Sequence, residues 1–255
     1  MAKGSPGADS SVPVTSLING QNIVDQASSF FGAMPVFWGR YFTGVATTGI
    51  VEYRHMRENP VLRARGVRVL PIARQTKRVN GTAADGTGDG QANAEDVITT
   101  FGKEYLATQD GQFYVFLDVE STPPLSLSYY RGWAQTLMAH SRDITLDQVT
   151  LLPCVYGTRF DTTTWNNVAT ATQQGIPCFG AWIARYFFGS GCRPLPDWNP
   201  DVVTPIDNMP CPILIWQYAA DCQGNAGYDC NVTNPNNDLD NDLLSRLILP
   251  PDNAV

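Results

Sequence analysis

The segment Phe113–Glu120 (Phe-Tyr-Val-Phe-Leu-Asp-Val-Glu) constrains the fold most, because it is an apolar run that ends in two acids. Side chains alternate along a strand, so Asp118 and Glu120 share one face, with Cα atoms about 7 Å apart. A strand that is apolar on both faces is buried on both sides, as in a parallel sheet covered by helices. The segment therefore predicts an α/β fold with two acids at the end of a central strand.

Two acids at the end of a buried strand need hydrogen bonds, ion pairs or an open cleft, because burial of an unpaired charge is unfavourable. One protonated carboxyl beside one ionised carboxyl is the pair of catalytic groups that glycoside hydrolysis uses. The motif alone leaves a structural alternative open, in which the pair only caps a helix or holds an arginine.

The composition indicates one large globular domain: 255 residues, of which 43% are hydrophobic and 16% charged. The formal net charge of −7 argues against a nucleic-acid partner. No apolar run approaches the twenty residues of a membrane span. We expect a disordered N-terminal lead over residues 1–13, the folded domain over 14–250 and a tail over 251–255.

The polar N-terminus lacks the apolar core of a signal peptide. A removed signal, export by another route and retention in the cell all stay open. All six cysteines fall in the last two-fifths of the chain, without a Cys-x-x-Cys pair. Disulfides that clip the loops Cys222–Cys230 and Cys192–Cys211 would imply an oxidising destination; six reduced thiols are the alternative. If the protein works outside a reducing cytoplasm, we expect Cys222 to bond to Cys230.

Strand-like and helix-like segments alternate along the chain, which predicts a single-domain (β/α)₈ TIM-type barrel; a doubly wound open sheet is the competing fold. No Gly-rich nucleotide-binding loop follows any strand. The predicted strands are Val14–Asn19, Pro35–Phe42, Val67–Ile72, Gln112–Glu120, Thr150–Tyr156, Ile176–Tyr186, Pro212–Tyr218 and Tyr228–Val232. The predicted helices are Gln21–Phe31, Val51–Arg65, Ala94–Ala107, Ser126–His140, Thr163–Gln174 and Leu239–Leu249.

In such a barrel the C-terminal strand ends surround the active site, so residues at those ends are candidate site residues. Acids ringed by aromatic and amide side chains suit a sugar ligand, although any single aromatic residue can equally fill the core. The candidate catalytic residues are Glu120, Asp118 and Asp229. The candidate substrate-binding residues are Arg40, Tyr156, Trp182, Arg185, Tyr186, Trp216, Gln217 and Tyr218.

Five motifs follow one another in barrel order: Phe113–Glu120, Leu152–Gly157, Ala181–Tyr186, Ile215–Tyr218 and Gly227–Asn231. Together they resemble the family 25 glycoside hydrolases (lysozyme-type muramidases) and the related DUF1906 glycoside-hydrolase-like domains. The resemblance implies that Glu120 is the general acid. It implies that Asp118 is an ionised neighbour that stabilises the oxocarbenium-like state or orients the substrate N-acetyl group, and that Asp229 is a further acid.

The first strand departs from that resemblance, because family 25 enzymes carry an Asp at its end. The predicted first strand offers Asn19 in that position, and Asp25 is predicted to be helical. A neutral residue there would remove one of the charges that tune the pKa values of the other acids.

The segment Asp85–Asp96 has oxygen ligands at the spacing of an EF-hand calcium loop, with glycine at position 6. A flexible acidic loop that leads into the next helix is the alternative. The candidate calcium ligands are Asp85, Thr87, Asp89, Asn93 and Asp96.

The leading hypothesis is a glycosidase-like barrel that acts on an N-acetylhexosamine-containing cell-wall glycan outside the cytoplasm, with no required cofactor. A glycan-binding or structural module that has lost turnover is the second hypothesis. A metal-stabilised interaction domain, built on the predicted calcium loop, is the third. The fold alone separates none of them.

Overall fold

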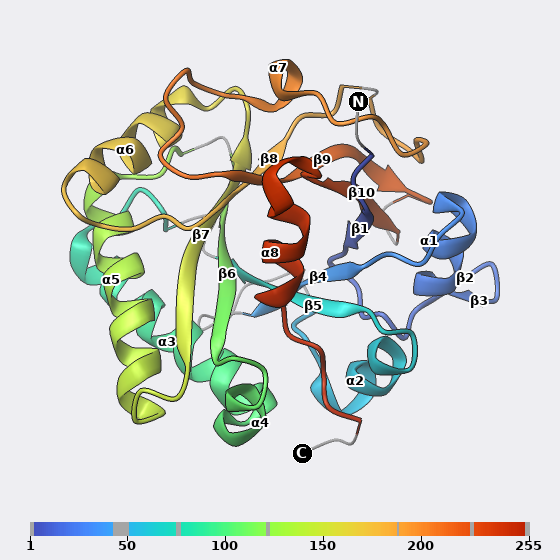
Figure 1. Ribbon diagram of the computed structural model, residues 1–255, viewed down its shortest axis with the longest axis horizontal. Coiled ribbons are helices and arrows are strands. Elements are labelled where there is room, and N and C mark those ends of the chain that lie inside the picture. Colours follow the sequence, from blue (N-terminus) through green and yellow to red (C-terminus); the bar gives the residue numbers. More distant parts are fainter. Residues whose placement is uncertain are drawn as a thin grey trace.

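The protein is a closed eight-stranded barrel wrapped by helices (Figure 1), as seen in a computed structural model that describes residues 3–42, 51–74, 78–120, 123–187, 189–224 and 227–252. The single-domain barrel prediction is confirmed, and the open sheet is excluded because β1 pairs with both β4 and β10. The barrel strands are β1 (Pro6–Asp9), β4 (Phe37–Phe42), β5 (Arg68–Arg74), β6 (Gln112–Val119), β7 (Thr150–Thr158), β8 (Ala181–Ala184), β9 (Ile213–Cys222) and β10 (Tyr228–Thr233).

Seven of the barrel strands are parallel and β10 runs antiparallel to both of its neighbours. The reversal arises because β9 and β10 form a hairpin. The start of β10 therefore lies beside the C-terminal ends of the other strands, with Asp229 opposite Asp9 in the β1–β10 register. An acid at the beginning of β10 thus reaches the same end of the barrel as acids at the ends of parallel strands.

Helices cover the outside of the barrel in the order expected from the sequence. Each described helix is too short or too polar to cross a membrane. The short hairpin of β2 (Leu17–Ile18) and β3 (Gln21–Asn22) precedes the first helix. The helices are α1 (Ile23–Phe31), α2 (His55–Ala64), α3 (Ala83–Phe101), α4 (Lys103–Ala107), α5 (Leu127–Ile144), α6 (Thr162–Gln173), α7 (Pro200–Val203) and α8 (Leu239–Ser245), with the short 3₁₀-helix η1 (Asn236–Asp238) before α8.

Large side chains fill the barrel interior, where Phe37, Phe116 and Trp182 belong to one buried cluster. Helix α8, red in Figure 1, packs its Leu243 against this cluster, and the Tyr114 hydroxyl donates a 2.6 Å hydrogen bond to Asp242 Oδ2. Tyr114 lies early in β6, so α8 covers the N-terminal opening of the barrel. The interior is therefore a packed core, and only the opposite end is open for a site.

The first barrel strand is not where the sequence predicted it. The segment expected as a disordered lead contains β1, which is buried along its whole length, and the expected strand Val14–Asn19 is wrong. Asn19 lies in the β2–β3 turn with φ of 53°, outside the barrel. Gly7 permits the close packing of β1, because a Cβ there would lie 2.2 Å from the Phe37 ring. Residues 1–2 and 253–255 of the expected lead and tail lie outside the described residues.

The expected calcium loop is wrong, because its residues belong to helix α3. Thr82 and Asp85 form a capping box at the start of the helix. Gly86 lets α5 approach closely, since a Cβ there would lie 2.1 Å from the carbonyl oxygen of Tyr129. The predicted ligand Asp89 instead accepts a 2.8 Å hydrogen bond from the Tyr129 hydroxyl. The polar residues of this segment thus serve helix packing rather than a loop.

The disulfide joins Cys192 to Cys222, and the expected Cys222–Cys230 bond is wrong. Cys230 is a buried thiol in the register position opposite Ala219 on β9. The hairpin geometry separates the two cysteines that are close in sequence, and the long loop after β8 brings Cys192 to the end of β9. The bond fits an oxidising compartment.

Candidate functional site

Acids from separate strands lie at the C-terminal end of the barrel. Asp9 ends β1, Asp118 is next to last in β6 and Asp229 is second in β10. Asp9 and Asp118 are almost fully buried, with exposed fractions of 5% and 3%. Gly39 of β4 leaves room for this arrangement, because a Cβ there would lie 2.6 Å from Asp9 Cβ. Glu120 follows β6 directly and is exposed.

Two amide side chains hold the carboxylates of Asp9 and Asp229. Asn231 Nδ2 donates a 2.7 Å hydrogen bond to Asp9 Oδ1, and Gln217 Nε2 donates to the same oxygen at 3.1 Å. The same Gln217 nitrogen donates to Asp229 Oδ2 at 2.9 Å. The Asp221 backbone N–H donates to the other oxygen of Asp229 at 2.8 Å. Because one nitrogen serves both carboxylates, Asp9 and Asp229 form a like-charge pair.

Burial and mutual repulsion disfavour ionisation of this pair. Burial, followed by repulsion from Asp229, holds the pKa of Asp9 well above its ordinary value, and the hydrogen bonds from Asn231 and Gln217 oppose that rise. Burial raises the pKa of Asp229 to about 6. The negative charge of Asp118 further raises the pKa of Asp9, so both other acids disfavour the ionised form of Asp9.

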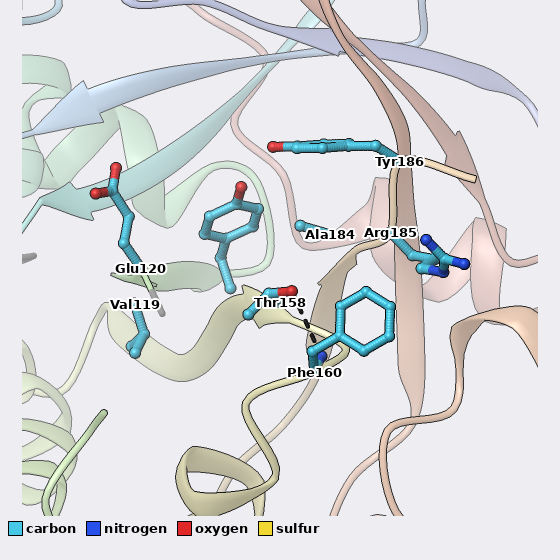
Figure 2. A pocket seen from close by; sticks show the side chains of 8 residues that line it. Val119, Glu120, Thr158, Phe160, Ala184, Arg185 and Tyr186 are labelled. Carbon is cyan, nitrogen blue, oxygen red and sulfur yellow. Dashed lines mark hydrogen bonds between the residues drawn. The ribbon is translucent and has the colours of Figure 1, made fainter. Parts of the chain in front are cut away.

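A cavity of about 630 Å³ opens beside these acids (Figure 2). Glu120 projects into it from the end of β6, and the Tyr186 ring lies across the cavity from it. The remaining lining residues are Val119, Tyr156, Thr158, Phe160, Ala184 and Arg185. A second, smaller pocket of about 120 Å³ is lined by Asp9, Tyr41, Asp229 and residues of the loops around them.

Two tyrosines connect the large cavity to the buried acids. The hydroxyls of Tyr156 and Tyr186 donate to Gln217 Oε1 at 2.7 and 3.1 Å. The Gln217 amide therefore accepts on the cavity side and donates to Asp9 and Asp229 on the other. A group bound in the cavity and the buried carboxylates are linked through one side chain. Such a network fixes the orientation of every member.

The predicted substrate-binding residues lie in different parts of the barrel. Tyr156, Arg185 and Tyr186 line the cavity, and Gln217 lies in the hydrogen-bond network behind it. Trp182 lies beneath the network in the barrel core, where its Nε1 donates to Asn231 Oδ1 at 2.9 Å. The expectation that the remaining residues line the cavity is wrong. These residues point out of the barrel: Arg40, Trp216 and Tyr218.

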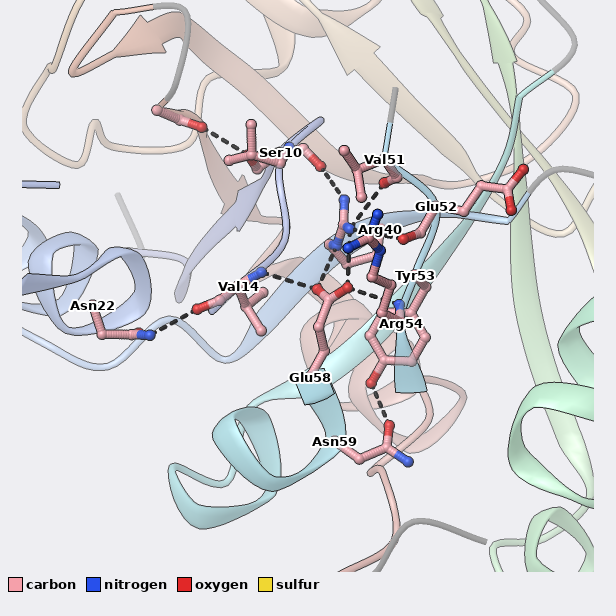
Figure 3. Close-up of polar contacts among 12 residues, drawn as sticks. Ser10, Val14, Asn22, Arg40, Val51, Glu52, Tyr53, Arg54, Glu58 and Asn59 are labelled. Atoms are coloured by element: carbon pink, nitrogen blue, oxygen red, sulfur yellow. Dashed lines mark hydrogen bonds and ion pairs between the residues drawn. The ribbon is translucent and has the colours of Figure 1, made fainter. Parts of the chain in front are cut away.

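Arg40 forms a fully buried ion pair with Glu58 of α2 (Figure 3). Its Nε donates to Glu58 Oε2 at 2.8 Å, and its Nη1 donates to the Ser10 carbonyl at 2.7 Å. Glu58 Oε2 also accepts the Val14 backbone N–H at 2.9 Å. The pair thus anchors the chain immediately after Asp9 instead of binding a ligand.

Sequence reasoning missed Asp9, which occupies the end of the first strand. Asn19 was expected there, and the structure corrects that expectation. The segment Pro6-Gly-Ala-Asp9 is short and contains no large apolar side chain, so periodicity gives no signal for a strand. No group of three or more His, Cys, Asp or Glu among the described residues is suited to hold a metal ion.

Solved structures with the same fold exist, although no protein-family model and no curated protein matches the sequence. An uncharacterized protein of B. stearothermophilus has a TM-score of 0.64 at 18% identity, covering 96% of this chain and all of that one. A muramidase from Acremonium alcalophilum has a TM-score of 0.51 at 18% identity, covering 94% and 99%. The Clostridium perfringens spore cortex lytic enzyme SleM has a TM-score of 0.52 at 14% identity, covering 92% and 68%. At these identities the likeness shows a shared barrel fold.

Proposed function

We propose that this protein is a glycosidase that cleaves an N-acetylhexosamine-containing glycan of the peptidoglycan type by carboxylate acid/base catalysis. The observation that carries the proposal is the convergence of the Asp9, Asp118 and Asp229 carboxylates beside a cavity into which Glu120 projects. Cleavage through an oxocarbenium-like state needs one group that gives a proton and nearby negative charge that stabilises the developing cation.

Glu120 is the proposed acid, because it is the carboxyl of this group that opens directly into the large cavity. Asp118, two residues earlier on the same strand face, supplies negative charge beneath the sugar ring. Asp9 and Asp229 hold further charge behind Gln217, and their repulsion favours a state in which one of them is protonated. Tyr156 and Tyr186 offer hydroxyl groups and ring faces to the sugar.

The sequence motifs resemble those of the family 25 and DUF1906-like glycoside hydrolases, and Asp9 at the end of the first strand supports the proposal that this chain belongs with them. The absence of an acid on the first strand was the main reason to expect an inactive binding module. Asp9 at the end of β1 removes that reason. Two proteins with this fold are named as a muramidase and a spore cortex lytic enzyme, which supports a cell-wall glycan as the substrate class for this chain. The Cys192–Cys222 disulfide supports action outside the cytoplasm.

The test is Glu120→Gln, which preserves shape but removes the transferable proton. We expect wild-type protein to clear a suspension of purified peptidoglycan and to release reducing ends, and the variant to lose this activity by a factor of at least about 100. Glu104→Gln is the matched control. The Glu104 side chain is 79% exposed on α4, which precedes the start of β6, whereas Glu120 follows the end of that strand. Equal cleavage by wild type and Glu120→Gln would contradict the proposed role of Glu120.

A glycan-binding module with the same barrel is the other outcome of this test. It would bind peptidoglycan in a sedimentation assay without releasing reducing ends at any pH between 4 and 8. The acids would then serve only as hydrogen-bond acceptors for sugar hydroxyls.

A further inference from the structure

Arg185 occupies an unusual position in the large cavity. Its guanidinium carbon lies 4.8 Å from the centre of the Phe160 ring and 5.5 Å from that of Phe187. Both rings are largely exposed, at 65% and 53%. Figure 2 places Arg185 and Phe160 at the opposite end of the cavity from Glu120. A cation and an exposed aromatic surface therefore lie together, away from Glu120.

The guanidinium of Arg185 lacks an acidic partner in the part of the chain that the structure describes. Among the described residues no carboxylate forms an ion pair with it, and its buried Nε has no hydrogen-bond partner. The nearby Arg159 differs, because its Nε and Nη2 donate to the carbonyls of Thr204 and Asp201 at 3.1 and 3.0 Å. Arg159 is used by the fold, whereas the guanidinium of Arg185 keeps donors for a ligand.

The two rings restrict the guanidinium before any ligand arrives. Stacking on aromatic faces orients the planar fork of an arginine, so less rotamer entropy is lost when the fork binds a carboxylate. The protein carries a net charge of −7, and the Glu120 carboxyl lies at the other end of the cavity. An anionic group of a ligand is repelled there and attracted at Arg185, which fixes the direction in which a charged glycan lies.

We propose that Arg185 binds a carboxylate substituent of the glycan, while the exposed face of Phe160 packs against the sugar that carries it. This inference rests on the proposed function, since it assigns one end of the same cavity. The carboxylate belongs either to the sugar itself, as in a lactyl ether, or to a short peptide attached to it. Both present the same planar, bidentate partner to the guanidinium.

The experiment compares three N-acetylhexosamine oligosaccharides of equal length by calorimetry, with Glu120→Gln protein so that none is consumed. One is neutral, one carries a free lactyl carboxylate, and one carries a lactyl group amidated with a peptide that ends in a carboxylate. We expect at least one acidic oligosaccharide to bind about tenfold more tightly than the neutral one, as for a charge-assisted hydrogen-bonded pair. The acidic ligand that shows the preference identifies the source of the carboxylate.

Substitutions then assign the preference to the guanidinium. Arg185→Gln should remove the tenfold preference and leave the affinity for the neutral oligosaccharide within about twofold, whereas Arg185→Lys should keep part of it. Arg159→Gln is the matched control and should leave the preference unchanged. Raising the salt concentration should weaken the binding of the acidic oligosaccharide to the proteins that keep a cation at position 185, and should not do so for Arg185→Gln.

Equal affinity of the parent protein for neutral and acidic oligosaccharides would overturn this inference, as would an equal loss for all ligands in Arg185→Gln. Cleavage of peptidoglycan without a charge preference defeats only the Arg185 assignment. A charge preference without cleavage defeats only the enzymatic function. Absence of binding to all three oligosaccharides overturns the Arg185 assignment, and the enzymatic function is then decided by the peptidoglycan cleavage assay alone.

Discussion

Two buried charged groups lie on opposite faces of the barrel wall, and they are stabilised in different ways. On the outer face Arg40 and Glu58 neutralise each other at 2.8 Å, with no exposed side-chain surface. On the inner face Asp9 and Asp229 share a sign, and neutral amides rather than a cation satisfy their oxygens. The first arrangement pairs two opposite charges. The second leaves the acids with raised pKa values.

The difference indicates which buried charges serve structure and which serve chemistry. The Arg40–Glu58 pair combines opposite charges with hydrogen bonds to the backbone on both sides, so it holds the chain in place. A like-charge pair held by amides has raised pKa values, and perturbed acids of this kind are typical of reaction sites. The two groups are adjacent along the chain, because Arg40 binds the carbonyl of Ser10, the residue after Asp9. The outer pair therefore positions the inner one.

The largest expected effect comes from breaking the outer pair with Glu58→Gln. The glutamine keeps the shape but leaves the Arg40 cation buried without a counter-charge. We expect the free energy of unfolding, measured by urea denaturation at pH 7, to fall by about 3–5 kcal/mol.

The control for that substitution is Asp252→Asn, which removes an exposed partner of Arg63. The Asp252 side chain is 72% exposed, and such pairs contribute about 0–1 kcal/mol. A similar small loss in both variants would mean that the outer pair does not anchor the chain.

The sequence predicted most of the fold because the barrel strands are dense in large apolar residues. The strands β6, β7 and β10 lie within two residues of their expected bounds. Strand β1 could not be predicted, because its stability comes from pairing with β4 and β10, which are distant in sequence. The disulfide was mispredicted for the same reason, since sequence proximity does not report the register of a hairpin.

The candidate site was only partly predictable. The sequence placed Asp118 and Glu120 at the end of one strand and Asp229 on another, because both strands are recognisable from their residues. Arg40 was misplaced because Phe37–Phe42 is apolar on both faces, so the pattern does not reveal which face is inside. Within that strand Tyr41 lines the smaller pocket, whereas Arg40 points toward α2. The interior and exterior faces become distinguishable only when the barrel closes.

The inner pair should make stability depend on pH in the direction opposite to a salt bridge. Burial raises the pKa of Asp229 to about 6, above the value near 3.9 of an unfolded chain. Between about pH 4 and 6 the native state therefore binds more protons than the unfolded state. The contribution of Asp229 to the free energy of unfolding should fall by roughly 2–3 kcal/mol as pH rises through this window. Urea denaturation at several pH values for wild type and Asp229→Asn would measure the difference; parallel pH curves would contradict it.

The smallest expected effect is the response of stability to Asp9→Asn. The substitution removes one of two repelling charges and retains an oxygen that can accept from Asn231 and Gln217. Because burial and Asp229 raise the pKa of Asp9, the ionised form destabilises the fold at pH 7. We expect the free energy of unfolding to rise by about 1 kcal/mol, while glycan cleavage falls. Asp207→Asn, at the rim of a separate surface pocket, should change neither quantity. If Asp9→Asn instead destabilises the protein as strongly as Glu58→Gln, the inner acids serve the same structural role as the outer pair, and the distinction between the two faces of the wall disappears.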